Sequence, residues 1–194
     1  HHYQNANTQD LIDAFHDTTG QEIGWFIDQW VSKGGEPHLQ VDFSINKKAG
    51  TYDLFVEQLQ DTTPLVATFK MPVWVEIYFE SGKKARKQFW LKNHKDTFQL
   101  EIKGKEKISY VLFDPNQEIL KQLNFERSTE WLLNQAVKAE NMLDRHDALV
   151  SLRLVSIKKK EQVLRAVFSK EQYYYTQAEA LNQLIKAGVN VKKE

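Results

Sequence analysis

The stretch TGQEIGWFIDQWVSKGGEPHLQVDFS, residues Thr19 to Ser44, contains the transition around which the chain is organised. Its apolar residues first recur with the 3.6-residue period of a helix and then alternate with polar residues, as in a half-buried strand. The helical positions are Ile23, Phe26, Ile27 and Trp30, and the alternating positions are Leu39, Val41, Phe43 and Ile45. We therefore predict a helix, then a strand, with a domain boundary between them.

Small and rigid residues mark this boundary. Gly34 and Gly35 supply positions without a Cβ atom where a helix can end, and Pro37 cannot continue one. Thr19 and Glu22 have the spacing of a capping box, which predicts that the helix starts there. The structural residues that we assign to the boundary are Phe26, Trp30, Gly34, Gly35 and Pro37.

The residues before this stretch predict a second helix. Asn7 or Thr8 can cap it, Leu11 and Phe15 share one face, and Gly20 ends it. The two helices together have too little apolar area to form a domain. We therefore expect them to pack either on the following sheet or on a domain upstream of this sequence.

From His38 to about Asp114 the pattern is that of successive short strands separated by turn residues. The predicted strands are 39–45, 52–59, 68–71 joined to 73–79, 84–91, 97–102 and 108–113. Strands so closely spaced favour antiparallel pairing, and a small antiparallel β-sandwich is the predicted fold. Pro72 has no amide hydrogen, so its strand should lie at an edge or bend there.

After Asp114 the helical period returns. Four helices are predicted around Trp131, Ala148, Leu164 and Leu181, and a shift of 32 residues superposes the apolar positions of the first pair on those of the second. This weak repeat predicts α-helical hairpin repeats of the HEAT or armadillo kind, cut inside a longer array. The predicted class is thus a multi-part α+β chain with a helical pair in 1–35, a sandwich in 36–125 and a truncated repeat domain in 126–194.

The composition excludes several classes of function. Twenty-six basic and twenty-six acidic residues cancel, so no net charge attracts nucleic acid or an anionic membrane. No apolar run is long enough for a membrane span. The absence of cysteine excludes disulfides and thiolate chemistry but does not indicate a compartment, so the localisation stays unknown. His1 and His2 are consistent with either a native start or a tag remnant.

The segment from Ala6 to Val41 resembles the part that closes the catalytic domain in the aminopeptidase N family of zinc metallopeptidases. The matching features are an Asp-Leu helix, a Thr-Gly break, a Phe-x-x-x-Trp helix and a Gly-x-Pro that leads into a strand. Here they are Asp10 and Leu11, Thr19 and Gly20, Phe26 and Trp30, and Gly35 and Pro37. The resemblance continues more loosely through KMPVWVEIYF, residues 70–79, and into the helix near Trp131.

The resemblance implies a parent that is a zinc-dependent aminopeptidase, a hydrolase whose metal is held by H-E-x-x-H on one helix. This sequence has no such motif, and its histidines, at positions 1, 2, 16, 38, 94 and 146, lack helical ligand spacing apart from the adjacent first two. We therefore expect no catalytic residue, no metal site and no cofactor in this chain, with zinc only in the parent's catalytic domain.

Three other clusters are candidate sites. Arg145, His146 and Asp147 suggest acid–base chemistry, but neighbours along a helix point apart, so a polar face is the simpler interpretation. The lysines at 158–160 are expected to form a solvated turn between hairpins. The tyrosines at 173–175 offer stacking surfaces, although packing explains such a run more often.

The leading hypothesis is a non-catalytic piece of an aminopeptidase that braces the catalytic domain and helps to restrict peptide access. Its partners would be that domain and further helical repeats. The main alternative is a protein-binding scaffold of the same architecture without peptidase activity. A carbohydrate-binding sandwich is weaker, since it needs a row of exposed aromatics such as Trp74, Tyr78 and Trp90.

Overall fold

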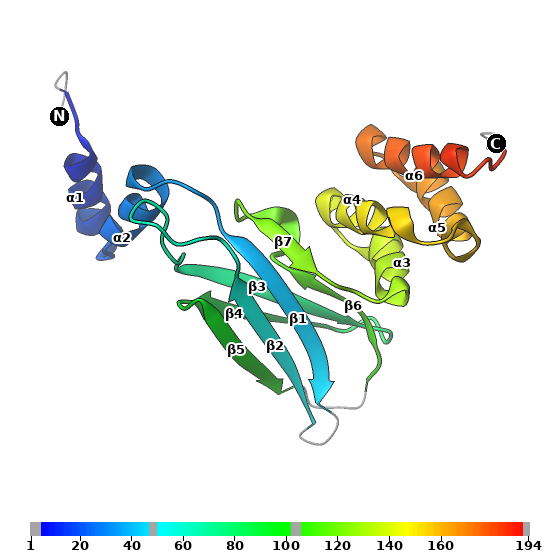
Figure 1. Cartoon of the computed structure of the whole chain (residues 1–194), viewed down its shortest axis with the longest axis horizontal. Helices are drawn as coiled ribbons and strands as arrows, with labels where there is room; N and C mark the ends of the chain where they lie inside the picture. Colours follow the sequence, from blue (N-terminus) through cyan, green and yellow to red (C-terminus); the bar gives the residue numbers. More distant parts are fainter. Residues whose placement is uncertain (1–4, 47–49, 102–105, 192–194) are drawn as a thin grey trace.

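The computed structural model describes residues 5–46, 50–101 and 106–191 (Figure 1). Two β-sheets form the middle of the molecule, and helices lie at either end of it. Three positions used in the sequence predictions, His1, His2 and Ile102, lie outside the described residues. The described part is thus a mixed α+β structure that contains two sheets and six α-helices.

The two sheets pack face to face around one apolar core. The first sheet has the order β5-β2-β1-β7 and the second has the order β4-β3-β6. Their strands are β1 (His38–Asn46), β2 (Thr51–Gln58), β3 (Met71–Phe79), β4 (Lys84–Leu91), β5 (Lys95–Glu101), β6 (Ile108–Phe113) and β7 (Gln122–Phe125). Leu54 and Val56 from one sheet and Val75 and Ile77 from the other lie in this core, each at most 2% exposed. The sandwich prediction is confirmed in this coarse sense.

The sandwich contains one parallel pair of strands, which differs from the wholly antiparallel fold that the sequence predicts. Strand β7 was missed, and it pairs with β1 in parallel, with His38 opposite Gln122 and Val41 opposite Phe125. At four residues β7 is too short to show a period-2 pattern of its own. One further hydrogen bond joins β7 to the boundary: Gln122 N donates to the carbonyl of Pro37 at 2.9 Å.

The strand predicted over 68–71 was wrong for a specific reason. Strand β3 starts only at Met71, and the backbone groups of the preceding residues bond to side chains instead of another strand. Gln58 donates to Phe69 O at 2.8 Å and accepts from Phe69 N at 2.9 Å. Gln29 makes the same pair of bonds to Lys70. The segment therefore has its hydrogen bonds satisfied without joining a sheet.

Pro72 lies inside β3, the central strand of its sheet, where a proline is normally excluded. Pairing with β6 begins only at Val75, so at Pro72 the strand pairs with β4 alone. The strand is thus an edge locally, as the proline required. Val73 and Phe79 are buried on the predicted core face, but Glu76 on the opposite face is also only 5% exposed.

The N-terminal helices differ in detail from the prediction. Helix α1 spans Thr8–Thr19, starts with a capping box between Asn7 and Asp10, and ends at Gly20 in the left-handed region. The capping box predicted for Thr19 and Glu22 was wrong, because the Thr19 hydroxyl donates back to Phe15 O. The next helix is a single turn, α2 (Gly24–Ile27), which continues as a π-helix over Asp28–Ser32.

The C-terminal helices form two packed pairs with a core of their own. They are α3 (Thr129–Lys138), α4 (Met142–Ser151), α5 (Ile157–Lys170) and α6 (Tyr174–Lys186). Helix α3 packs on α4 and α5 on α6, while α4 also contacts α6. Leu132 and Leu164, which the 32-residue shift superposes, are both buried in this core.

The prediction of a solvated turn at the lysines 158–160 was wrong, because these residues lie in the first turn of α5. Lys160 is only 4% exposed and donates to the carbonyls of Leu152 at 2.6 Å and Arg153 at 3.1 Å, and to Gln183. Burial lowers the pKa of this amine. The residue therefore closes the C-terminal end of the preceding helix, which is what a cation favours there.

Candidate functional site

An apolar groove of about 480 Å³ lies between α2 and the outer face of β3. We call it the aromatic groove, and its main lining residues are Trp25, Phe26, Trp30, Pro72, Trp74 and Leu120. Trp25 is 41% exposed, Phe26 45% and Leu120 69%. So many large apolar side chains on one surface are typical of a place where another protein surface packs.

The rings of the groove are fixed by contacts with one another. The ring centroids of Trp25 and Trp90 lie 5.8 Å apart, and those of Phe26 and Trp30 lie 6.4 Å apart. Trp30 reaches inward to Phe69 of the sandwich core at 5.0 Å. Edge-to-face and tilted pairs of this kind favour one ring arrangement over others. The groove is therefore a preformed surface.

The predicted boundary residues hold α2 beside this groove. Gly35 has φ of +88°, and a Cβ atom there would lie 2.9 Å from a methyl group of Val66. Gly34 N donates to Leu65 O at 3.1 Å, and Pro37 is buried at the start of β1. The structure thus places Phe26 and Trp30 in the groove, and Gly34, Gly35 and Pro37 in the connection behind it.

The aromatic residues considered for carbohydrate binding do not form an open row. Arg86 covers the Trp74 ring, with its guanidinium carbon 4.4 Å from the ring centroid. Tyr78 stacks on Tyr110 with centroids 4.3 Å apart, next to helix α3. Burial, and then the nearby Glu76 carboxylate, raise the pKa of Tyr78. Of the three candidates, only Trp90 is exposed, at 43%, and its ring packs against that of Trp25.

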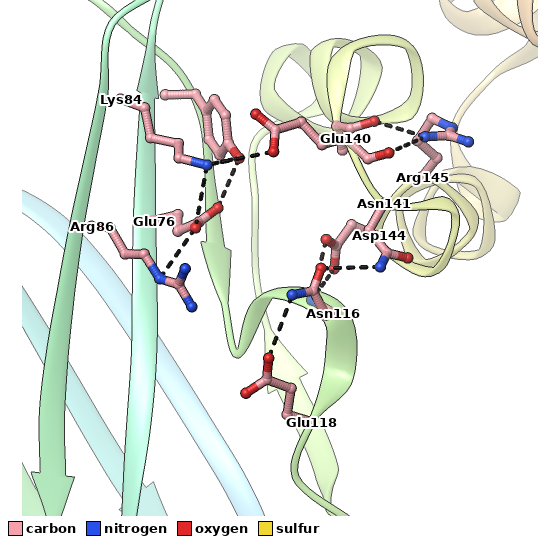
Figure 2. Close-up of polar contacts among 11 residues, drawn as sticks. Glu76, Lys84, Arg86, Asn116, Glu118, Glu140, Asn141, Asp144 and Arg145 are labelled. Carbon is pink, nitrogen blue, oxygen red and sulfur yellow. Dashed lines mark hydrogen bonds and ion pairs between the residues drawn. The ribbon is translucent and has the colours of Figure 1, made fainter.

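A polar cluster lies where the sandwich meets the C-terminal helices (Figure 2). The buried Glu76 carboxylate lies 3.5 Å from Lys84 and 3.4 Å from Arg86, and it accepts a 2.7 Å bond from the Tyr78 hydroxyl. Its charge is therefore balanced within the sheet. In the sequence, this cluster is indicated by nothing more than a carboxylate on the outer face of an alternating strand.

The described histidines lie apart from one another. His16 is near Glu22, His38 near Glu36 and His94 near Glu57, each on the surface. Within residues 5–46, 50–101 and 106–191, no group of three or more histidine, cysteine, aspartate or glutamate side chains is arranged to hold a metal ion.

The Arg145, His146 and Asp147 triplet is split between different partners. Arg145 forms a two-pronged pair with Glu171, at 2.6 and 3.0 Å, which lowers the pKa of that carboxyl. Asp147 pairs with Arg127 at 2.5 Å, and the His146 ring lies 4.6 Å from that of Tyr175. The three side chains thus join the helices to one another and to the sandwich.

The comparisons with known proteins bear on the fold. No model of a protein family matches the chain, and no curated protein matches its sequence. None of the helices in the described residues is long and apolar enough to cross a membrane. Among solved structures the chain is similar to Legionella pneumophila aminopeptidase A in complex with aspartic acid, with a TM-score of 0.70 and 19% identity over 93% of this chain. The chain spans about a quarter of that protein's length, with 23% of it covered, and its fold is similar to that of one segment of it.

Proposed function

We propose that this chain is a non-catalytic structural part of a zinc-dependent aminopeptidase, a metallopeptidase of the aminopeptidase N family. Residues 1–35 close the catalytic domain, residues 36–125 form the β-sandwich, and residues 126–194 begin a domain of HEAT- or armadillo-like helical repeats. The observation that carries the proposal is the fold similarity to an aminopeptidase segment over 93% of the chain. The boundary motif from Asp10 to Pro37 supports it independently.

The exposed apolar surfaces support a bracing role. Helix α1 has no buried residue, and its apolar side chains Leu11 and Phe15 are 57% and 37% exposed. Together with the aromatic groove they offer apolar area at the N-terminal end of the molecule, where the resemblance places the catalytic domain (Figure 1). Burying such area provides the free energy for docking. The sandwich then holds the catalytic domain and the helices at a fixed separation.

The chemistry belongs to the parent. In this proposal the zinc ion, its ligands and the residues that bind the peptide lie in the catalytic domain, and this chain supplies none of them. The helical repeats stand beside the active site and restrict the size of peptides that reach it. Positioning of this kind changes access and alignment rather than the chemical step.

The test has two parts. The open reading frame upstream of His1 should contain H-E-x-x-H and a more distal glutamate. The encoded catalytic domain, produced separately, should bind the 194-residue chain in a titration calorimeter. The double variant Trp25→Ala with Phe26→Ala should weaken that binding at least tenfold, because it removes two exposed rings from the groove.

A matched control is Tyr174→Ala, which removes an 81% exposed ring at the opposite end of the molecule and should leave binding unchanged. Equal loss in both variants, or no binding by the wild-type chain, contradicts the proposal. This chain alone should release no amino acid from aminoacyl-chromophore substrates, with or without zinc. Chelator-sensitive turnover by the chain alone would likewise contradict it.

The alternative is a protein-binding scaffold with the same architecture in a parent that has no peptidase activity. The aromatic groove serves that function equally well, because it is a docking surface in both cases. An upstream reading frame without H-E-x-x-H would favour the scaffold.

A further inference from the structure

The contact between the sandwich and helix α4 is built around a buried carboxylate without an ion-pair partner among the described residues. Asp144 is 5% exposed and lies in the first turn of α4. Its two oxygens each accept from Asn116 N at 3.3 Å, across the junction (Figure 2). These bonds are long, so they compensate only weakly for the loss of water around a charged group.

The loop opposite Asp144 has an unusual backbone. Asp114, Asn116 and Gln117 all have positive φ, at 54°, 68° and 53°. Side chains disfavour this region, and such conformations persist only where surrounding contacts hold them. Those contacts reach across the junction, since Asn141 donates to the Asn116 side chain at 3.0 Å and Gln117 donates to Leu143 O at 3.3 Å. The loop and the start of α4 therefore hold each other in place.

The cations near Asp144 are already paired with other carboxylates. Lys121 forms a close ion pair with Asp114, and Arg127 pairs with Asp147 at 2.5 Å. Lys121, Arg127 and Asp147 line the same small cavity as Asp144, which has a volume of about 90 Å³. The Nε atom of Arg127 is buried there and has no hydrogen-bond partner among the residues that the structure describes. Asp144 thus faces a polar cavity whose positive charges are balanced without it.

Charged groups from several neighbouring segments lie around Asp144. They are Asp147 on its own helix, Glu76 on β3, Asp114 before the short 3-10 turn at 115–117, and Lys121 and Arg127 at the two ends of β7. Gln135 of α3 is neutral and donates to Asp144 O at 2.8 Å. Burial, opposed by the Asn116 bond and reinforced by the neighbouring carboxylates, raises the pKa of Asp144 to about 6.

We propose that Asp144 is a proton-dependent switch at the junction of the sandwich and the helical hairpins. The neutral carboxyl holds α4 against the loop at 114–117, and the ionised carboxylate draws water into the cavity and loosens that contact. Helix α3 remains packed on β6 through Tyr110 and Leu112 in both states, because that contact is apolar. The helices therefore change their angle to the sandwich without separating from it.

This inference does not depend on the proposed function, because every group in it belongs to the described chain. The junction would respond to a change of pH near 6, where few side chains titrate. A change of angle at this junction alters where the helical hairpins stand relative to anything docked in the aromatic groove, whose lining residue Leu120 follows shortly after the loop at 114–117.

The absence of cysteine makes a direct test possible, because two labels can be placed without removing native thiols. Gln99→Cys on β5 and Gln162→Cys on α5 are exposed sites on the two sides of the junction. Spin labels at these sites should give a distance distribution that shifts or broadens when the pH rises from 5 to 8. With Asp144→Asn added, the distribution should stay at its pH 5 form at both pH values.

The control is a label pair within the helices, Gln162→Cys and Ala178→Cys, whose distance should not change. Identical wild-type distributions at pH 5 and 8 overturn the proposal, and so does a shift that survives Asp144→Asn or that appears in the control pair. Carboxyl-carbon NMR of the unsubstituted chain provides a check that needs no variant. A resonance of Asp144 that is fully ionised from pH 4.5 upward also overturns it.

Discussion

The side chain of Gln29 forms two hydrogen bonds with the main chain of Lys70, donating to its carbonyl at 2.9 Å and accepting from its amide at 2.7 Å. This pair joins the π-helix to the extended segment before β3 and thereby fixes α2 beside the aromatic groove. Gln29 is only 9% exposed and its two bonds with Lys70 are partly buried, so water compensates only in part for their loss.

Replacing Gln29 with alanine should therefore lower the free energy of unfolding by about 1 to 3 kcal/mol, the cost of leaving buried polar groups unpaired. Urea denaturation followed by circular dichroism measures it. Gln99→Ala, an exposed glutamine on β5, is the matched control and should change stability by less than about 0.5 kcal/mol. Equal effects of the two substitutions would show that the Gln29 bonds do not stabilise the fold.

The adjacent glycines of the boundary should respond differently to alanine. Gly35→Ala places a Cβ atom 2.9 Å from Val66 in a backbone with φ of +88°. It should destabilise the chain by about 1 to 3 kcal/mol. Gly34→Ala meets no atom within 4 Å and has no such backbone, so it should be nearly neutral. Thermal unfolding of both variants decides the matter, and a neutral Gly35→Ala would refute this role for the residue.

Lys160 and Lys159 provide a second matched pair within one run of lysines. Lys160→Met removes the donor that satisfies Leu152 O and Arg153 O in a buried position, while Lys159 is exposed. The first change should cost about 1 to 3 kcal/mol, and Lys159→Met should cost less than about 0.5 kcal/mol. Denaturant midpoints at pH 7 compare them. A Lys160→Met protein as stable as wild type would mean that these carbonyls find other partners.

Asp144 predicts a pH dependence of stability with a definite sign. Burial raises its pKa from 3.8 to about 6, so the folded chain binds this proton more tightly than the unfolded chain does. The stability that this group contributes is present below pH about 4 and is lost as the pH rises through 6.

Asp144→Asn should therefore raise the free energy of unfolding at pH 7 by about 1 to 3 kcal/mol and remove that slope. Denaturation curves between pH 4 and 8 measure both effects. Asp42→Asn, at an exposed aspartate of β1, is the control and should keep the wild-type slope. A variant that is less stable than wild type at pH 7 would contradict the expected sign.

Local patterns predicted most of the strands: burial alternates along β2, and β6 is a continuous buried run. The predicted bounds of β4 and β6 agree with the structure, and the helical residues around Leu132 and Leu164 form a buried core as expected. These patterns depend on neighbours along the chain, so a sequence reports them directly.

The missed features depend on contacts between distant residues. Nothing near Phe69 indicates that Gln58 replaces a neighbouring strand, and β7 is defined only by its pairing with β1. The burial of Asp144 results from the meeting of α4 with the loop that contains Asn116. An acidic residue in the first turn of a helix ordinarily indicates an exposed group near the helix dipole, so no local pattern indicates this burial.

The parallel pairing of β7 with β1 affects how the protein is made. The partner of His38 in that pairing is Gln122, more than eighty residues later, so one edge of β1 stays uncovered until nearly the whole sandwich has been synthesised. An uncovered strand edge is a template for pairing with other chains. The nascent chain therefore exposes this edge while more than eighty further residues are synthesised, and slowing translation within this region should increase aggregation.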